Sequence, residues 1–183
     1  MKLSDSTYYN LRRLHSLSGV VPVGAFLLEH LATNAVALNG PAAYNRAVAA
    51  LSRLPFLTAL EVLLIGVPIL FHMLVGVLIV TTGEASVQRE RYPRNWMYVL
   101  QRVSGVFLAF FIIYHVWGTR LSPEAAAHRA DLYRFMRDHL QQPGVLAVYL
   151  LGTVAACFHL GNGLFGFAIH WGLAATRTAQ RRA

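Results

Sequence analysis

Four stretches of this chain contain no charged residue, and their lengths restrict the fold to very few possibilities. They are Leu14–Leu28, Val62–Gly83, Val103–Thr119 and the stretch between Asp138 and Arg177. A membrane-spanning helix needs about 20 mostly apolar residues. The chain is 56% hydrophobic and only 13% charged, whereas a soluble domain usually has about 25% charged residues. The pattern predicts an all-α integral membrane protein, folded as a four-helix up-down bundle.

We expect the spans as one transmembrane domain over residues 1–183, with helices at about 11–38, 55–82, 96–120 and 144–175. The first apolar run is not followed by a small-residue cleavage site, so it is interpreted as a span and not as a signal peptide. Gly161-Asn162-Gly163 offers an alternative, a hairpin within the fourth stretch. Two spans and a turn need about 40 residues or more, which favours one long tilted helix.

Basic residues are distributed unequally between the two sides of such a bundle. The side with both termini and the loop 83–95 holds Lys2, Arg12, Arg13, Arg89, Arg91, Arg94, Arg102, Arg177, Arg181 and Arg182. The other side holds Arg46, Arg53, Arg120, Arg129, Arg134 and Arg137. The positive-inside rule then places both termini in the cytoplasm. The net charge of +8 could suggest binding to nucleic acid. The arginines cluster at the ends of the spans, however, and this pattern fits membrane topology better. Pro41 and Ser122-Pro123 predict short interfacial helices in the two outer loops.

Each span contains one deeply placed histidine, and an ionisable group within a span indicates a functional site. These are His30, His72, His115 and His159, spaced by 42, 43 and 44 residues. Helices one and three run outward and helices two and four run inward. His30 and His115 should therefore share an outer level, and His72 and His159 an inner level. Counting 1.5 Å per residue separates the two levels by ~10 Å.

Two imidazoles facing each other across a bundle are the ligand set of a six-coordinate haem b, which carries electrons. The four histidines therefore predict two haem b groups, with the histidines as iron ligands. Candidates to hold the haem propionates are Arg13, Ser16, Ser18, Arg102 and Ser104; their alternative role is interfacial anchoring. Candidates to make room for the rings, or to allow close helix packing, are Gly19, Gly76, Gly105, Gly161, Gly163 and Gly166. Of the four further histidines, His15 and His170 are expected to be interfacial or propionate-side residues near the inner surface, and His128 and His139 to be solvated in an outer loop.

The chain also contains a weak internal repeat of a helix pair. Leu14–Val20 resembles Leu100–Val106, and a histidine follows 11 residues after Gly19 and 10 after Gly105. The second and fourth helices share the pattern Phe-His-x-x-x-Gly, which begins at Phe71 and at Phe158.

Several motifs resemble one known family. Residues 11–24 (LRRLHSLSGVVPVG) running on to Glu29-His30, Phe158–Leu164 and Trp171–Leu173 are similar to the dihaem cytochrome b subunit of bacterial succinate:quinone oxidoreductases, the succinate dehydrogenases and fumarate reductases. The resemblance implies a membrane anchor for an FAD flavoprotein and an iron–sulfur protein in the bacterial cytoplasmic membrane. In that family the first and third ligands hold the distal haem, and the second and fourth hold the proximal one. The family usually has a fifth membrane helix, which we do not expect in a chain that ends at Ala183.

The expected function is electron transfer between iron–sulfur clusters and quinone, with menaquinone plausible from the resemblance, in an enzyme of the tricarboxylic acid cycle. The chain has no dinucleotide fingerprint and one cysteine, so we do not expect it to act on a dicarboxylate alone. Glu29 and Glu61 are candidate proton relays for quinone. The alternative for both is an acid that reaches the interface or pairs with Arg53 or Arg120. Alternative functions are a haem b subunit of a formate dehydrogenase or hydrogenase, a transporter with histidine metal ligands, and a cofactor-free anchor.

Overall fold

The computed structural model describes residues 4–83 and 92–182, and this part of the chain is helical with short connections. The predicted cytoplasmic residues Lys2, Arg89 and Arg91 lie outside the described residues. Four helices are long and apolar enough to cross a membrane: Asp5–Asn39, Leu57–Thr82, Pro93–Ala127 and Pro143–His170. The prediction of an all-α protein with four spans is therefore confirmed.

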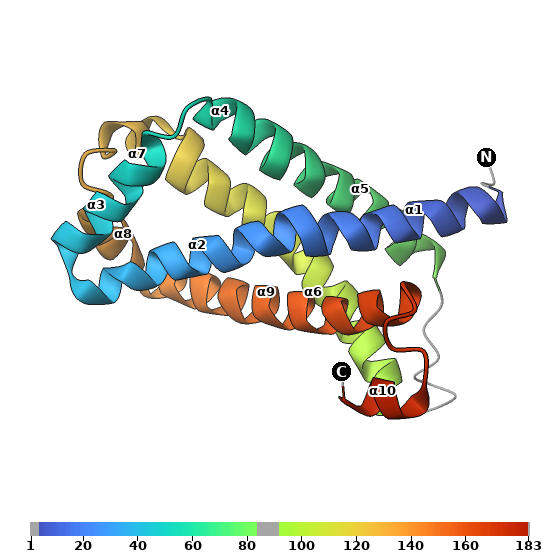
Figure 1. Cartoon of the computed structure of the whole chain (residues 1–183). Coiled ribbons are helices and arrows are strands. Elements are labelled where there is room, and N and C mark those ends of the chain that lie inside the picture. Colours follow the sequence, from blue (N-terminus) through green and yellow to red (C-terminus); the bar gives the residue numbers. More distant parts are fainter. Residues whose placement is uncertain (1–3, 84–91, 183) are drawn as a thin grey trace.

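The first span is one continuous rod built from four helical segments (Figure 1). These are α1 (Asp5–Ser18), the π-helical turn η1 (Gly19–Gly24), α2 (Ala25–Ala35) and the 3-10 turn η2 (Val36–Asn39). Pro22 lies inside η1, where its missing N–H removes one hydrogen bond of the regular helix. A π turn accommodates one extra residue. That extra residue accounts for the longer spacing from Gly19 to His30 than from Gly105 to His115.

The second and third spans also contain π turns near their outer ends. The second consists of α4 (Leu57–Leu60), η3 (Glu61–Gly66) and α5 (Val67–Thr82). The third consists of α6 (Pro93–Val116), η4 (Trp117–Leu121) and α7 (Pro123–Ala127). Pro93 and Pro123 stand in the first turn of their helices, where a missing N–H costs nothing.

The fourth span, α9 (Pro143–His170), is unbroken through Gly161–Gly163, so the hairpin alternative is wrong. The expected end near residue 175 is also wrong. Gly172 has φ +75°, a left-handed conformation that glycine adopts readily and that commonly ends helices. The chain then turns and forms α10 (Arg177–Arg182).

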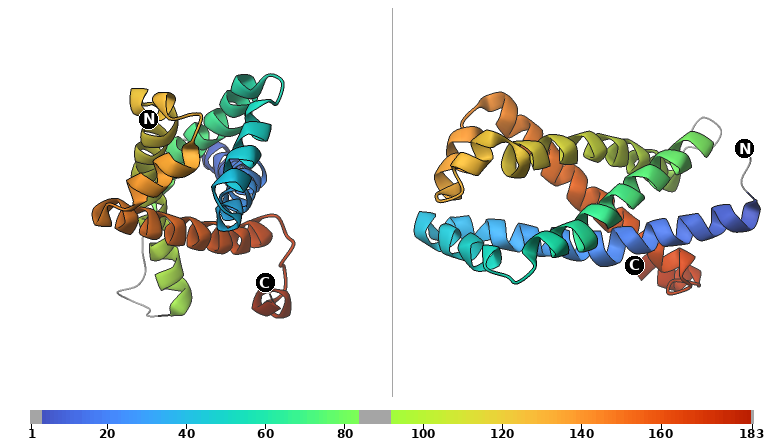
Figure 2. Two further views of the ribbon diagram at one scale, coloured as in Figure 1. Left: turned by 90° about the vertical axis from the view of Figure 1, so that its left-hand side faces the viewer. Right: turned by 90° about the horizontal axis from the view of Figure 1, so that it is seen from above.

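The four spans surround a common centre. Both α1 and α6 pack against α5 and α9, so α1 lies diagonally across from α6, and α5 across from α9 (Figure 2). The start of α1 and α10 lie at one end of the bundle, and α3 (Pro41–Ser52), α7 and α8 (Leu132–Leu140) lie at the other (Figure 1). This is the predicted up-down arrangement, with short helices in both outer loops.

A polar junction joins the two outer loops. The Asn45 amide donates to the Asp131 carboxylate (2.8 Å), and the amide oxygen accepts the Tyr133 N–H (3.1 Å). Asp131 also caps α8 by accepting the Arg134 N–H (3.1 Å). The hydrogen bond from Asn45, with that from Arg134, holds the pKa of Asp131 below its ordinary value. The two loops therefore form one cap on the bundle.

The outer-loop histidines both stack on Phe135 but differ in exposure. His128 is exposed, as expected. His139 is half-buried and stacks on the buried Phe135 (ring centroids 6.0 Å, interplanar angle 10°). The expectation that His139 is solvated is therefore wrong, because α8 turns this face toward the bundle.

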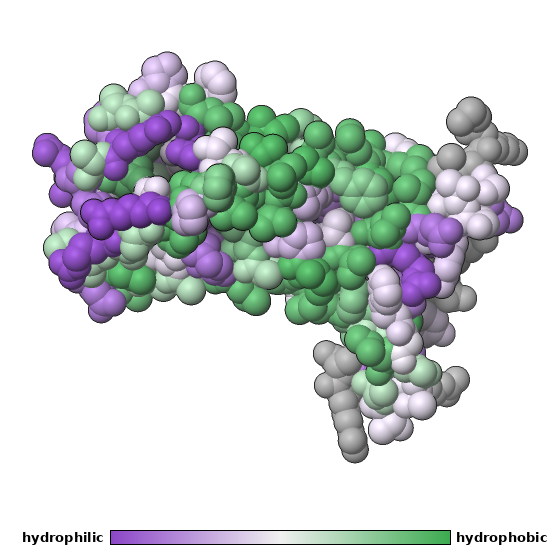
Figure 3. Space-filling view, turned by 45° about the horizontal axis from the view of Figure 1, so that its top comes forward, coloured by the Kyte–Doolittle hydropathy of each residue, from purple (hydrophilic) through white to green (hydrophobic). Residues whose placement is uncertain are grey.

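The surface is apolar along the bundle and polar at its two ends (Figure 3). Large apolar side chains point outward along the spans; Phe110 is 70% exposed and Val154 is 68% exposed. A surface of this kind is stable in lipid and not in water. The chain is a multi-pass membrane protein.

Candidate functional site

The four span histidines meet in two pairs inside the bundle. The rings of His30 and His115 have centroids 5.7 Å apart with an interplanar angle of 81°, and those of His72 and His159 are 6.1 Å apart at 82°. Each pair joins diagonal helices, α2 with α6 and α5 with α9. The structure therefore brings together the two pairs that the sequence predicted.

The spacing within each pair suits one metal ion between two imidazoles. A metal–imidazole nitrogen bond is about 2.0 Å long, so two ligands on opposite sides place their ring centroids ~6 Å apart. The observed separations are 5.7 and 6.1 Å. The residues present thus fit the axial ligands of two haem irons.

The inner pair rests against two equivalent Ser-Gly steps. A Cβ on Gly19 would overlap Cε1 of His72, and a Cβ on Gly105 would lie 2.9 Å from Cε1 of His159. The preceding serines are also in contact: Ser18 Oγ lies 3.4 Å from Nδ1 of His72, and Ser104 Oγ lies 3.1 Å from Nδ1 of His159. The repeated Ser-Gly sequence therefore marks the point where the first span contacts the histidine of the second span, and where the third span contacts the histidine of the fourth.

His15 is a member of the inner cluster that the sequence analysis missed. Its ring stacks on His72 with centroids 3.9 Å apart and an interplanar angle of 14°. The interfacial alternative for His15 is therefore wrong, and its propionate-side alternative stays a prediction. Gly76 permits the approach, because a Cβ there would lie 3.3 Å from Cε1 of His15. His170, in contrast, is exposed, and its Nδ1–H donates to the Gly166 carbonyl (2.7 Å).

The internal repeat contains the signal for His15. Position 101 is the repeat counterpart of position 15, and Gln101 Nε2 donates to the His159 carbonyl (3.0 Å). A Cβ on Gly163, the counterpart of Gly76, would lie 3.5 Å from that same Nε2. Aligning the two halves of the chain would have placed both polar side chains beside an inner histidine.

The outer pair has aromatic neighbours. Nδ1 of His115 lies 3.3 Å from the Tyr149 hydroxyl. Phe111 stacks near His115 (5.8 Å, 21°), and Phe26 lies 5.4 Å from His30. Tyr149 was not predicted, since nothing in the local pattern of the fourth span distinguishes it from a packing residue.

The candidate propionate residues lie toward the inner end and already have contacts within the chain, although Nε of Arg13 is buried without a hydrogen-bond partner. The Arg13 guanidinium lies over the Trp171 ring (4.2 Å), and Ser16 Oγ accepts the Trp171 indole N–H (3.2 Å). Arg102 donates to the carbonyls of Gly83 (2.9 Å) and Ile79 (3.0 Å) at the end of α5. Ser18 and Ser104 contact histidine rings, as described above. Their propionate roles stay predictions.

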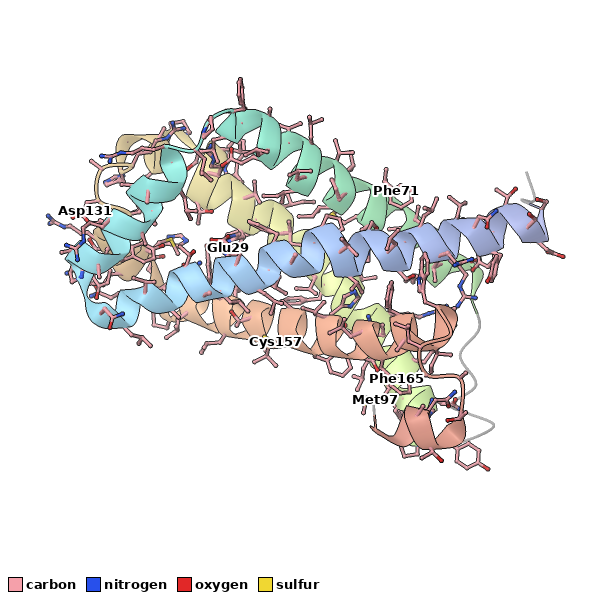
Figure 4. All side chains as sticks on the ribbon, viewed as in Figure 1. Glu29, Phe71, Met97, Asp131, Cys157 and Phe165 are labelled. Atoms are coloured by element: carbon pink, nitrogen blue, oxygen red, sulfur yellow. The ribbon has the colours of Figure 1, made fainter. Side chains whose placement is uncertain are left out.

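The two candidate quinone carboxylates have different surroundings. Glu61 forms an ion pair with Arg120 (2.6 Å), one of its two predicted partners. Glu29 accepts a hydrogen bond from Thr33 (2.6 Å) and lies exposed on α2 (Figure 4). An apolar hollow of about 500 Å³ between α6 and α9 is lined by residues that include Phe107 and neither carboxylate.

Of the six candidate glycines, two meet an inner ligand candidate directly, Gly19 and Gly105. Nothing lies within 4 Å of a Cβ placed on Gly161 or Gly166.

Within residues 4–83 and 92–182, no three His, Cys, Asp or Glu side chains gather as a metal-ion site. A metal carrier with mixed acid, thiol and histidine ligands therefore has no support in the described part of the chain.

Comparison with known proteins agrees with this geometry. Residues 86–183 match the family described as "Succinate dehydrogenase/Fumarate reductase transmembrane subunit". The chain is 39% identical over 179 residues to the succinate dehydrogenase cytochrome b558 subunit of Bacillus subtilis (strain 168), an alignment that covers 98% of this chain and 88% of that relative. No solved structure matches the chain significantly. An apolar four-span bundle, paired histidines and close sequence similarity lead to one assignment: the chain belongs to the family of succinate dehydrogenase and fumarate reductase transmembrane subunits.

Proposed function

We propose that the chain holds two haem b groups and conducts electrons between an iron–sulfur subunit and membrane quinone. The observation that carries this proposal is the presence of two histidine pairs, with ring separations of 5.7 and 6.1 Å, on two different pairs of diagonal helices. The name of the Bacillus relative, a cytochrome b558 subunit, supports haem b as the cofactor. Bound between two imidazoles, haem b exchanges one electron at a time and has no open position for oxygen.

In this proposal the four histidines would hold the two haem irons, His72 with His159 at the inner site and His30 with His115 at the outer one. The chain's own part is to hold the rings at two depths and to exclude water from them. His72 and His159 would hold a haem that receives electrons from the end of the bundle where α10 and the start of α1 lie, and His30 and His115 would hold one that is nearer the outer loops.

The expected partners are an iron–sulfur subunit and an FAD subunit, docked at the end of the bundle with α10. That end carries described arginines, including Arg12, Arg13 and Arg94, which suit an acidic docking surface or anionic lipid. The basic-residue distribution supports an orientation with this end in the cytoplasm, and the similarity to the Bacillus relative supports the cytoplasmic membrane of a bacterial cell as the location. Quinone reduction takes two electrons and two protons, and Glu61 and Glu29 are the candidate proton-relay carboxylates.

Haem analysis of paired histidine variants tests the proposal. Pyridine haemochrome analysis of the purified protein should give about two haems per polypeptide. His72→Ala and His159→Ala should remove the same spectral component, and His30→Ala should remove the other. One haem in the unmodified protein, or loss of different components from the first two variants, would refute the assignment.

Partner binding needs its own experiment. Affinity purification from native membranes should recover flavin and iron–sulfur proteins with the cytochrome, and succinate should then reduce the inner haem. A stable preparation with intact haems and no such partners would contradict the anchor function and favour a free-standing quinone-linked cytochrome.

A further inference from the structure

The two inner histidines are not held in the same way, although the repeat makes their surroundings alike. A neutral imidazole carries a hydrogen on one nitrogen and a lone pair on the other, and only the lone pair binds a metal. The hydrogen-bond partner of one nitrogen therefore decides whether the other is free to be a ligand.

For His72 this partner is the backbone. Its Nδ1 lies 3.0 Å from the carbonyl oxygen of His15. A carbonyl oxygen only accepts, so Nδ1 carries the hydrogen and Nε2 carries the lone pair. Ser18 Oγ is farther from Nδ1, at 3.4 Å, and donates its own hydrogen to the same carbonyl (2.9 Å).

For His159 the hydrogen bond of Nδ1 goes to a side chain, although the Gln101 carbonyl, the counterpart of the His15 carbonyl, also lies beside this ring. Its Nδ1 lies 3.1 Å from Ser104 Oγ. The Ser104 hydroxyl donates its one hydrogen to the Gln101 carbonyl (3.1 Å), so toward His159 the oxygen is an acceptor. Ser104 is 9% exposed and is the buried polar residue of the described part of the chain. Water is therefore poorly placed to replace its hydroxyl.

We propose that Ser104 is the positioning residue for His159, holding Nδ1–H so that the Nε2 lone pair is available to the inner haem iron. The inference rests on the proposed haem function. Ser18 occupies the same place in the first half of the chain, but it is redundant there, because the His15 carbonyl already holds His72. Both halves of the repeat therefore contain the serine, but only Ser104 determines the tautomer of the histidine beside it.

The hydrogen bond has an electronic consequence. An acceptor on Nδ1–H raises the basicity of the ligating nitrogen, and a more basic ligand favours ferric over ferrous iron. Removing the Ser104 hydroxyl should therefore raise the midpoint potential of the inner haem. Removing the Ser18 hydroxyl should change it much less.

The matched variants are Ser104→Ala and Ser18→Ala, each tested in the full complex by redox titration of both haems. We expect an upward shift of the inner-haem potential in Ser104→Ala, with a changed EPR spectrum of that oxidised haem and an unchanged outer haem. Ser18→Ala should resemble the unmodified protein. Ser104→Thr keeps a hydroxyl that also bonds to the preceding turn, and it should restore both signals.

Loss of the inner haem in Ser104→Ala alone, reversed in Ser104→Thr, also supports the proposal. Equal effects of the two alanine variants, including no effect in either or haem loss in both, would overturn it, and so would failure of Ser104→Thr to restore the signals. These outcomes are distinct from failure of the haem function itself, in which the unmodified protein would lack the inner haem.

Discussion

The close approach of Gly105 to His159 makes a quantitative prediction about a single methyl group. A Cβ in Gly105→Ala would lie 2.9 Å from Cε1 and 3.5 Å from Nδ1 of His159. Carbon atoms in contact are about 3.5–4.0 Å apart, so the ring must retreat by at least ~0.6 Å. Metal–ligand distances tolerate only about 0.2 Å. If the chain holds two haems as proposed, we therefore expect Gly105→Ala to lose the inner one.

Gly161→Ala is the matched control on the facing helix, because nothing lies within 4 Å of the added Cβ. Both substitutions favour helix formation by roughly 1 kcal/mol, so loss of haem would not reflect a weaker helix. Pyridine haemochrome analysis, normalised to polypeptide, should give about one haem for Gly105→Ala and about two for Gly161→Ala. Two haems of unchanged potential in Gly105→Ala would refute the steric argument.

Three further predictions concern the outer end and the orientation. The pKa of Asp131 is lowered in the folded protein. Its contribution to the stability of the outer cap is therefore complete above pH ~4 and is lost as the pH falls through the folded-state pKa. Limited proteolysis should show that the outer loops open in acid, and in Asp131→Ala they should be open at neutral pH as well. Glu61→Gln breaks an ion pair with side chains 34% and 42% exposed, so it should cost at most ~1 kcal/mol of stability and leave both haems; an unchanged quinone reductase rate would exclude Glu61 as a relay. Arg94→Cys, with Cys157→Ser, should react in intact cells only with a membrane-permeant reagent, and labelling by an impermeant one would invert the orientation.

Much of the fold followed from the sequence because hydropathy and helix periodicity are local properties. The uncharged stretches located the four spans. The pairing of His30 with His115 needed only the alternation of direction in an up-down bundle. The Ser-Gly repeat was visible as a pattern, and its meaning became clear once His72 and His159 were seen to rest on it.

The remaining features depend on how separate helices are rotated and shifted against one another, which no single stretch of sequence encodes. The stack of His15 on His72 requires α1 and α5 to cross at Gly76. The choice of Arg120 over Arg53 for Glu61 requires the ends of the second and third spans, at η3 and η4, to meet. The difference between Ser18 and Ser104 depends on which neighbouring oxygen each histidine ring meets, the His15 carbonyl for His72 and the Ser104 hydroxyl for His159. The sequence alone therefore determined the spans and the histidine pairs, whereas only tertiary packing decided which polar groups hold each ring.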